Sequence, residues 1–92
     1  MPKKYPVLTL SEILEIVKNL GLVLNNTVGS HGQWVGTVNG KTVRVTVDNA
    51  INEFGIFLIK SMISQANVSR KQFYSLSKSA CKKINLKHKK SL

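Results

Sequence analysis

The clearest pattern of apolar and polar positions lies between Thr9 and Gly21, where apolar residues recur at helical intervals. Thr9 and Glu12 have the spacing of a capping box, in which a hydroxyl and a carboxylate satisfy the first backbone N–H groups of a helix. Gly21 is a residue type that commonly follows the end of a helix. The sequence therefore predicts a helix whose apolar stripe consists of Leu10, Ile13, Leu14, Val17 and Leu20.

The pattern then changes to short runs and strict alternation. Residues 22–28 form an apolar run that fades into polar positions, which indicates a first strand. Asn39 and Gly40 lie between two alternating segments, and this pair is the strongest short signal for a two-residue hairpin turn. Counting outward from the turn gives the strand register. One face then collects Trp34, Val43, Val45 and Val47, and we expect it to be the core side.

The opposite face of this hairpin collects polar side chains. The register pairs His31 with Asp48, Gln33 with Thr46, Val35 with Arg44, and Thr37 with Thr42. We therefore expect His31, the one histidine outside the C-terminal tail, to lie on an open sheet face opposite a carboxylate. A slip of one residue buries His31 instead, so this placement depends on the predicted turn.

The second half of the chain predicts helices. Residues 54–66 are apolar on more than one helical face, so this helix is either packed between other elements or partly offered to a partner. Ser69 and Gln72 repeat the capping-box spacing and predict a third helix. Its apolar stripe runs through Phe73, Leu76, Ala80 and Ile84. The predicted fold class is α+β, with a helix, three antiparallel strands and one or two helices on one sheet face.

A chain of 92 residues has room for one hydrophobic core. We divide it into an N-terminal basic arm (1–8), a folded domain (9–76) and a basic extension (77–92) that is helical at first and then disordered. Pro2 and Pro6 argue against helix in the arm, which is either disordered or lies along a groove. Cys81 has no partner cysteine for a disulfide or a zinc site, which favours a reducing cytoplasm and a structural or inert cysteine.

Charge points to the partner. Fourteen Lys and Arg against four Asp and Glu give a formal net charge of +10. Such a charge opposes compaction and is usual where the partner is a polyanion, so nucleic acid is the leading candidate. No apolar run is long enough for a spanning helix or a signal peptide, and we expect no membrane partner. We expect Trp34 to be core and not a base-stacking platform, and His88 to be solvated charge in the tail.

Three features in this order resemble the HicA family of bacterial toxins, over about Leu10 to Leu76. They are the helix 11–14 with Leu20-Gly21 at its end, the triplet Gly29-Ser30-His31 followed by Trp34, and the run 58–63 leading to 68–73. The resemblance implies a fold like that of double-stranded RNA-binding domains and mRNA cleavage with His31 as the catalytic residue. It also implies a HicB-type antitoxin that binds the toxin and blocks its site. The partner assembly that we expect is a homodimer or a heterotetramer with the antitoxin. The segment 47–52 lacks the second histidine that family members often carry there.

The chemistry of RNA cleavage suits this set of residues. Attack by the 2′-hydroxyl needs a base, an acid for the leaving 5′-oxygen, and positive charge near the phosphate. Imidazole suits either proton-transfer role near neutral pH. We expect Asp48 to fix the tautomer of His31, and Ser30, Gln33 and Arg44 to support it. The expected RNA contacts are Lys41, Arg44, Lys60, Arg70 and Lys71.

Few carboxylates and the lack of a Cys or His cluster argue against a metal site and against any cofactor. The predicted reaction is a metal-independent transesterification that leaves a cyclic phosphate. A second class of function stays open, a non-catalytic RNA-binding or protein-interaction module that uses the same open sheet, with His31 as a contact residue. Which RNA sites are cut, and whether His31 acts as acid or base, do not follow from the sequence.

Overall fold

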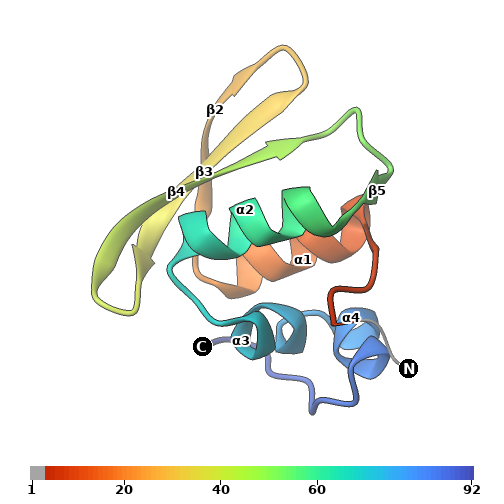
Figure 1. The fold of residues 1–92 in the computed structure, drawn as a ribbon. Coiled ribbons are helices and arrows are strands. Elements are labelled where there is room, and N and C mark those ends of the chain that lie inside the picture. The colour runs from red at the N-terminus through yellow and green to blue at the C-terminus, as the bar shows by residue number, and fades with distance from the viewer. Residues whose placement is uncertain (1–3) are drawn as a thin grey trace.

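The structure is a computed structural model that describes residues 4–92, so Met1, Pro2 and Lys3 of the predicted arm lie outside the described residues. It has the predicted α+β order (Figure 1). The elements are β1 (Leu8–Thr9), α1 (Leu10–Asn19), β2 (Val23–Val28), β3 (His31–Val38), β4 (Lys41–Asp48), β5 (Glu53–Phe54), α2 (Ile56–Ala66), α3 (Arg70–Ser75) and α4 (Lys78–Lys83). In the described part of the chain, every helix is too short or too polar to cross a bilayer.

The first helix begins as the capping box predicts. The Thr9 hydroxyl accepts a hydrogen bond from the Glu12 N–H at 3.3 Å, and Glu12 Oε1 accepts from the Thr9 N–H at 2.8 Å. Gly21 follows the helix with a left-handed φ of +87°, which a glycine adopts without a steric cost. The buried stripe includes Ile16. Leu10 and Leu14, which we also expected in it, are only partly buried.

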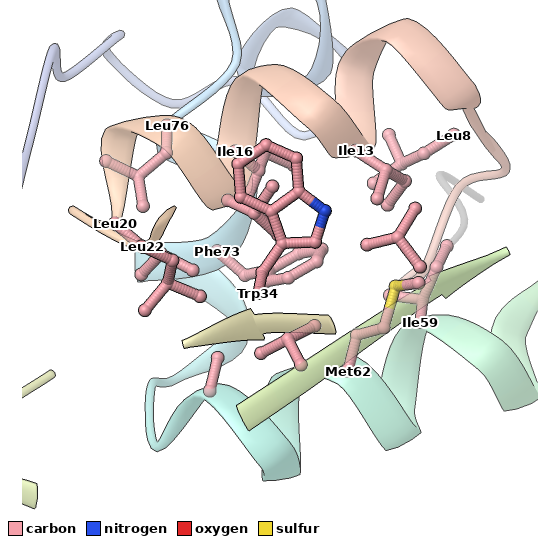
Figure 2. Packing of buried hydrophobic residues seen from close by; sticks show 14 of the residues in the cluster. Leu8, Ile13, Ile16, Leu20, Leu22, Trp34, Ile59, Met62, Phe73 and Leu76 are labelled. Carbon is pink, nitrogen blue, oxygen red and sulfur yellow. The ribbon is translucent and has the colours of Figure 1, made fainter. Parts of the chain in front are cut away.

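The predicted hairpin register is confirmed at every pair from His31–Asp48 to Val38–Lys41. Asn39 and Gly40 have φ values of +52° and +79°, the backbone that a type I′ turn requires at both central residues. Trp34 and the three valines on the same sheet face are buried, and the indole is only 8% exposed, which confirms its core role. Figure 2 shows this ring lying against α1 among side chains of the other helices.

The three-stranded antiparallel sheet has the order β2-β3-β4, and α1 and α2 lie on the same side of it (Figure 1). Apolar residues of both helices meet the sheet in one core, to which α3 adds Phe73. Strand β4 is an outer strand of this sheet, and α2 packs along it through Ile59, Met62 and Ala66. This placement of α2 creates the candidate site described below.

The prediction of one continuous third helix is wrong. The stripe from Phe73 to Ile84 is divided between α3 and α4, because the Ser77 hydroxyl accepts a hydrogen bond from the Ala80 N–H and starts a new helix. A serine that caps a helix competes with continuation of the preceding one. Cys81 in α4 is buried, as a structural cysteine should be.

The sequence did not predict the small sheet that β1 forms with β5. Leu8 pairs with Phe54, and both side chains are fully buried. The described part of the arm lies against α3, where the Tyr74 hydroxyl donates to the Pro6 carbonyl at 2.7 Å. After Lys83 the chain has no regular secondary structure.

Candidate functional site

The candidate site is centred on the end of the hairpin, where His31 begins β3 and Asp48 ends β4. The imidazole Nε2 lies 3.5 Å from Asp48 Oδ2. The histidine side chain is 55% exposed and the aspartate side chain 25% exposed, so a ligand in solvent can reach the pair. A turn at Gly29, with φ of +61°, brings the chain from β2 into this position. The structure therefore brings together the two residues that the register placed opposite each other.

Asp48 is held by its neighbours as an ionised carboxylate. Hydrogen bonds from the Ser30 hydroxyl and from the Ala50 N–H, together with the charge of His31, hold the pKa of Asp48 below its usual range. The Ala50 N–H lies 2.9 Å from Oδ1, which leaves Oδ2 for the imidazole. A backbone hydrogen bond also links the turn before β3 to the turn after β4, since the Asn49 N–H donates to the Ser30 carbonyl at 2.7 Å. This arrangement can fix the orientation of His31.

A pocket of about 220 Å³ opens beside this pair, between the end of β4 and α2. Its lining consists of His31, Thr46, Asp48, Ile51, Phe54, Leu58, Ser61, Met62 and Gln65. The deepest side chains are apolar, since Phe54 and Met62 belong to the core. The polar groups come from β3, β4 and one face of α2. Sequence reasoning missed Thr46, Ser61 and Gln65 as site residues, because no local pattern shows that α2 crosses this end of β4.

The expected RNA-binding residues lie away from the pocket. Arg44 shares a sheet face with Asp48 but is four positions along the strand, about 13 Å away. Lys41 is seven positions away, beside the hairpin turn, at about 23 Å. The ammonium of Lys60 lies 5.2 Å from the centre of the Tyr5 ring, and the Arg70 guanidinium 5.9 Å from it. Among residues 4–92, the pocket lining includes neither lysine nor arginine.

The remaining expected residues have other neighbours. Gln33 Oε1 accepts from the Thr46 hydroxyl at 3.0 Å, on the same sheet face as His31. Lys71 lines a separate hollow with Lys87 and Lys89. His88 is not simply solvated, because its Nε2 lies 3.8 Å from Glu15 Oε2.

No set of three or more His, Cys, Asp or Glu side chains within the described range is arranged to hold a metal ion. Comparisons with protein-family models, with curated proteins and with solved structures found no match for this chain. Fold and site together define a small, strongly basic α+β protein with a histidine–aspartate pair at the mouth of a mostly apolar pocket.

Proposed function

We propose that this protein is a metal-independent endoribonuclease of the HicA kind, the toxin of a toxin–antitoxin pair that cleaves mRNA in the cytoplasm. The observation that supports it is the exposed His31–Asp48 pair beside a pocket, on a chain of net charge +10. The order of one helix, three antiparallel strands and further helices is also compatible with a fold like that of double-stranded RNA-binding domains.

In this proposal the 2′-oxygen attacks the adjacent phosphorus, the bond to the 5′-oxygen breaks, and a cyclic phosphate remains. Nε2 of His31 lies 3.5 Å from Asp48 Oδ2, so in this proposal Nδ1 faces the substrate and carries one proton transfer. Water supplies the second transfer, since the lining of the pocket contains one histidine. The charge of the whole chain raises the local concentration of RNA, although the candidate cations lie several residues from the pair.

The test is cleavage of RNA by purified protein in the presence of a chelator. We expect His31→Ala to lower the rate by about 10²- to 10⁴-fold, because it removes a positioned proton-transfer group. His88→Ala is the matched control, since it removes the other histidine at a distance from the pocket lining. Equal rates for the wild type and His31→Ala, with both proteins folded, would contradict the proposal.

A second candidate function is a non-catalytic RNA-binding or protein-interaction module. It is favoured by one observation, that the pocket lining described above has no lysine or arginine to stabilise a phosphate in a transition state. If this second function is correct, His31→Ala weakens RNA or partner binding, and neither the wild type nor the variant cuts RNA. The chelator assay, run beside a binding measurement, distinguishes the two functions.

We infer further that a HicB-type antitoxin, an acidic protein, covers the site in the resting cell. Support comes from the exposed apolar start of α2, where Ile56, Phe57 and Leu58 face solvent and Phe57 is 87% exposed.

Expression of the protein alone should arrest growth, and co-expression of the antitoxin should restore it. Phe57→Asp should weaken rescue without slowing cleavage. Failure of the antitoxin to bind or to restore growth contradicts this part, and the mass of the complex distinguishes a homodimer from a heterotetramer.

A further inference from the structure

The pocket beside His31 is suited to an uncharged ring and not to a phosphate. Its floor is formed by the buried Phe54 and Met62, and the partly exposed Leu58 adds an apolar side chain to the lining. A phosphate placed deep in the pocket would lose its hydration without meeting a lysine or an arginine, because the lining described has neither. Its volume of about 220 Å³ is below the range of about 300–1,000 Å³ typical of drug-sized ligands. The pocket therefore has room for one flat ring system.

The side chain of Gln65 gives this pocket a hydrogen-bond donor. The Thr46 N–H, on the outer edge of β4, donates to Gln65 Oε1 at 3.3 Å. A backbone N–H can only donate, so the amide oxygen must face the strand and the NH₂ group must face away from it. This NH₂ makes no hydrogen bond to residues 4–92. Ser61, one helical turn earlier on α2, adds a hydroxyl to the same wall.

We propose that the pocket receives one unpaired RNA base next to the bond that is cut, and that Gln65 selects bases with a carbonyl oxygen on the edge that it meets. This inference rests on the proposed function, because it takes RNA as the substrate. Guanine and uracil carry an oxygen at the position where adenine and cytosine carry an amino group. An NH₂ donor pairs with the oxygen and opposes the amino group. The apolar floor contacts the face of the base, as side chains in single-strand sites commonly do.

The same geometry links base binding to cleavage. His31 lines the pocket that holds the base, so a seated base places its own ribose and phosphate at the histidine. Holding a reacting group in position is a large part of catalysis by small sites. Gln65 is thus a specificity-determining residue, and its removal should raise KM for RNA with guanine or uracil at the site more than it lowers kcat.

The test uses short RNAs with 2′-O-methyl groups, which cannot be cut by internal attack. Four oligonucleotides that differ in one central base are titrated into the full chain, and the side-chain NH₂ resonances of Gln65 are followed by NMR. We expect these resonances to shift when the central base is guanine or uracil. The protein should bind those two RNAs about tenfold more tightly than the RNAs with adenine or cytosine. Gln65→Glu keeps an oxygen for the Thr46 N–H but replaces the donor, and should reverse the preference.

Ser64→Ala is the matched control, since Ser64 is exposed on α2 outside the pocket lining. An unchanged base preference in Gln65→Glu, or binding that leaves the Gln65 resonances in place, overturns the inference. Base-selective binding without any cleavage of unmodified RNA overturns the proposed function and leaves the pocket assignment standing. Cleavage of unmodified RNA without a Gln65-dependent base preference overturns the pocket assignment and leaves the proposed function standing.

Discussion

The carboxylate of Asp48 owes its low pKa mainly to one neighbour, the Ser30 hydroxyl, with the Ala50 N–H and the charge of His31 adding to it. A carboxyl whose pKa is lower in the folded than in the unfolded state stabilises the fold above the unfolded pKa. That stabilisation is lost as the pH falls through the folded pKa. Ser30 therefore helps to keep the partner of His31 ionised, while the strand register places the two side chains opposite each other.

Ser30→Ala should raise the pKa of Asp48 toward its ordinary value, because it removes the largest cause of the lowering. The stability of the variant should consequently fall less steeply with acidification. Titration of the Asp48 carboxyl carbon by NMR measures the first effect, and urea unfolding in acid measures the second. Ser64→Ala serves as the control. An unchanged Asp48 pKa in Ser30→Ala would show that the hydroxyl does not donate to this carboxylate.

Trp34 sits in the core, so its truncation should be costly. Trp34→Ala should lower the free energy of unfolding by about 3–5 kcal/mol, since it leaves a cavity that the valines of β4 cannot fill. Val23→Ala in β2, where the side chain is 64% exposed, should change stability by less than about 0.5 kcal/mol. Urea unfolding of both variants compares them directly. A small effect at Trp34 would argue against its place in the core.

Two asparagines join the hairpin turn to the end of α2. The Asn39 side chain donates to the Asn67 carbonyl at 3.0 Å, and the Asn67 side chain donates to the Val38 carbonyl at 3.0 Å. Asn67 also ends α2 in a left-handed conformation, with φ of +59°. This link fixes α2 at the turn end of β4, while Gln65 holds it at Thr46, two residues before the other end of the strand. The position of the pocket wall follows from both attachments.

Asn67→Gly should lower the free energy of unfolding by about 0.5–1.5 kcal/mol, the cost of one hydrogen bond, because glycine keeps the left-handed backbone. Asn67→Ala should cost about 1 kcal/mol more, since alanine is strained there. Thermal and urea unfolding give both values. Equal effects of the two substitutions would mean that the hydrogen bond alone matters at this position.

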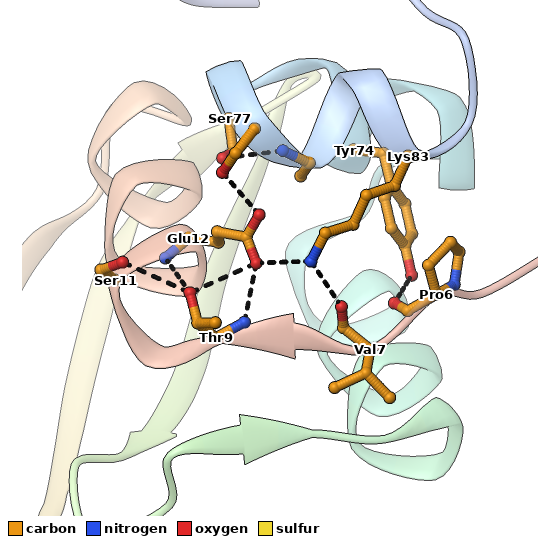
Figure 3. Close-up of polar contacts among 10 residues, drawn as sticks. Pro6, Val7, Thr9, Ser11, Glu12, Tyr74, Ser77 and Lys83 are labelled. Atoms are coloured by element: carbon orange, nitrogen blue, oxygen red, sulfur yellow. Dashed lines mark hydrogen bonds and ion pairs between the residues drawn. The ribbon is translucent and has the colours of Figure 1, made fainter.

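Across the whole molecule, Glu12 ties distant segments together (Figure 3). Its carboxylate accepts from the Thr9 N–H, from the Ser79 hydroxyl and from the Lys83 ammonium at 2.9 Å. The same ammonium donates to the Val7 carbonyl at 2.8 Å. The N-terminal segment, α1 and α4 are thus joined through one buried side chain. This network explains why a basic C-terminal segment packs on the domain.

Glu12→Gln should lower the free energy of unfolding by about 1–3 kcal/mol, because it removes charge-assisted hydrogen bonds from a buried site. Burial raises the pKa of Glu12, but the hydrogen bonds from Ser79, Thr9 and Lys83 outweigh it, and the pKa is lowered. The contribution of Glu12 is therefore present above its unfolded pKa and is lost in acid.

Urea unfolding at neutral and acidic pH tests this, with Glu53→Gln as a control at an exposed carboxylate. The difference between wild type and Glu12→Gln should shrink as the pH falls. A difference that stays constant through the acid range would contradict the assignment.

The sequence by itself determined the features that depend on near neighbours. Thr9 with Glu12 marked the start of α1, and Asn39 with Gly40 fixed the register that sets His31 opposite Asp48. These signals are readable because capping and tight turns restrict the backbone within a few residues. The break at Ser77 was missed because the apolar stripe continues through it, although the Ser77 hydroxyl caps the start of a new helix there.

Only the tertiary structure decided what lies around His31. No local pattern in β4 or α2 shows that Gln65 meets the Thr46 N–H, or that Phe54 pairs with Leu8 across a two-residue strand. These contacts join segments far apart in the chain, and their energies come from burial and edge pairing rather than from sequence periodicity. The histidine and its aspartate are therefore visible in the sequence, but the pocket beside them exists only because α2 folds across the end of β4.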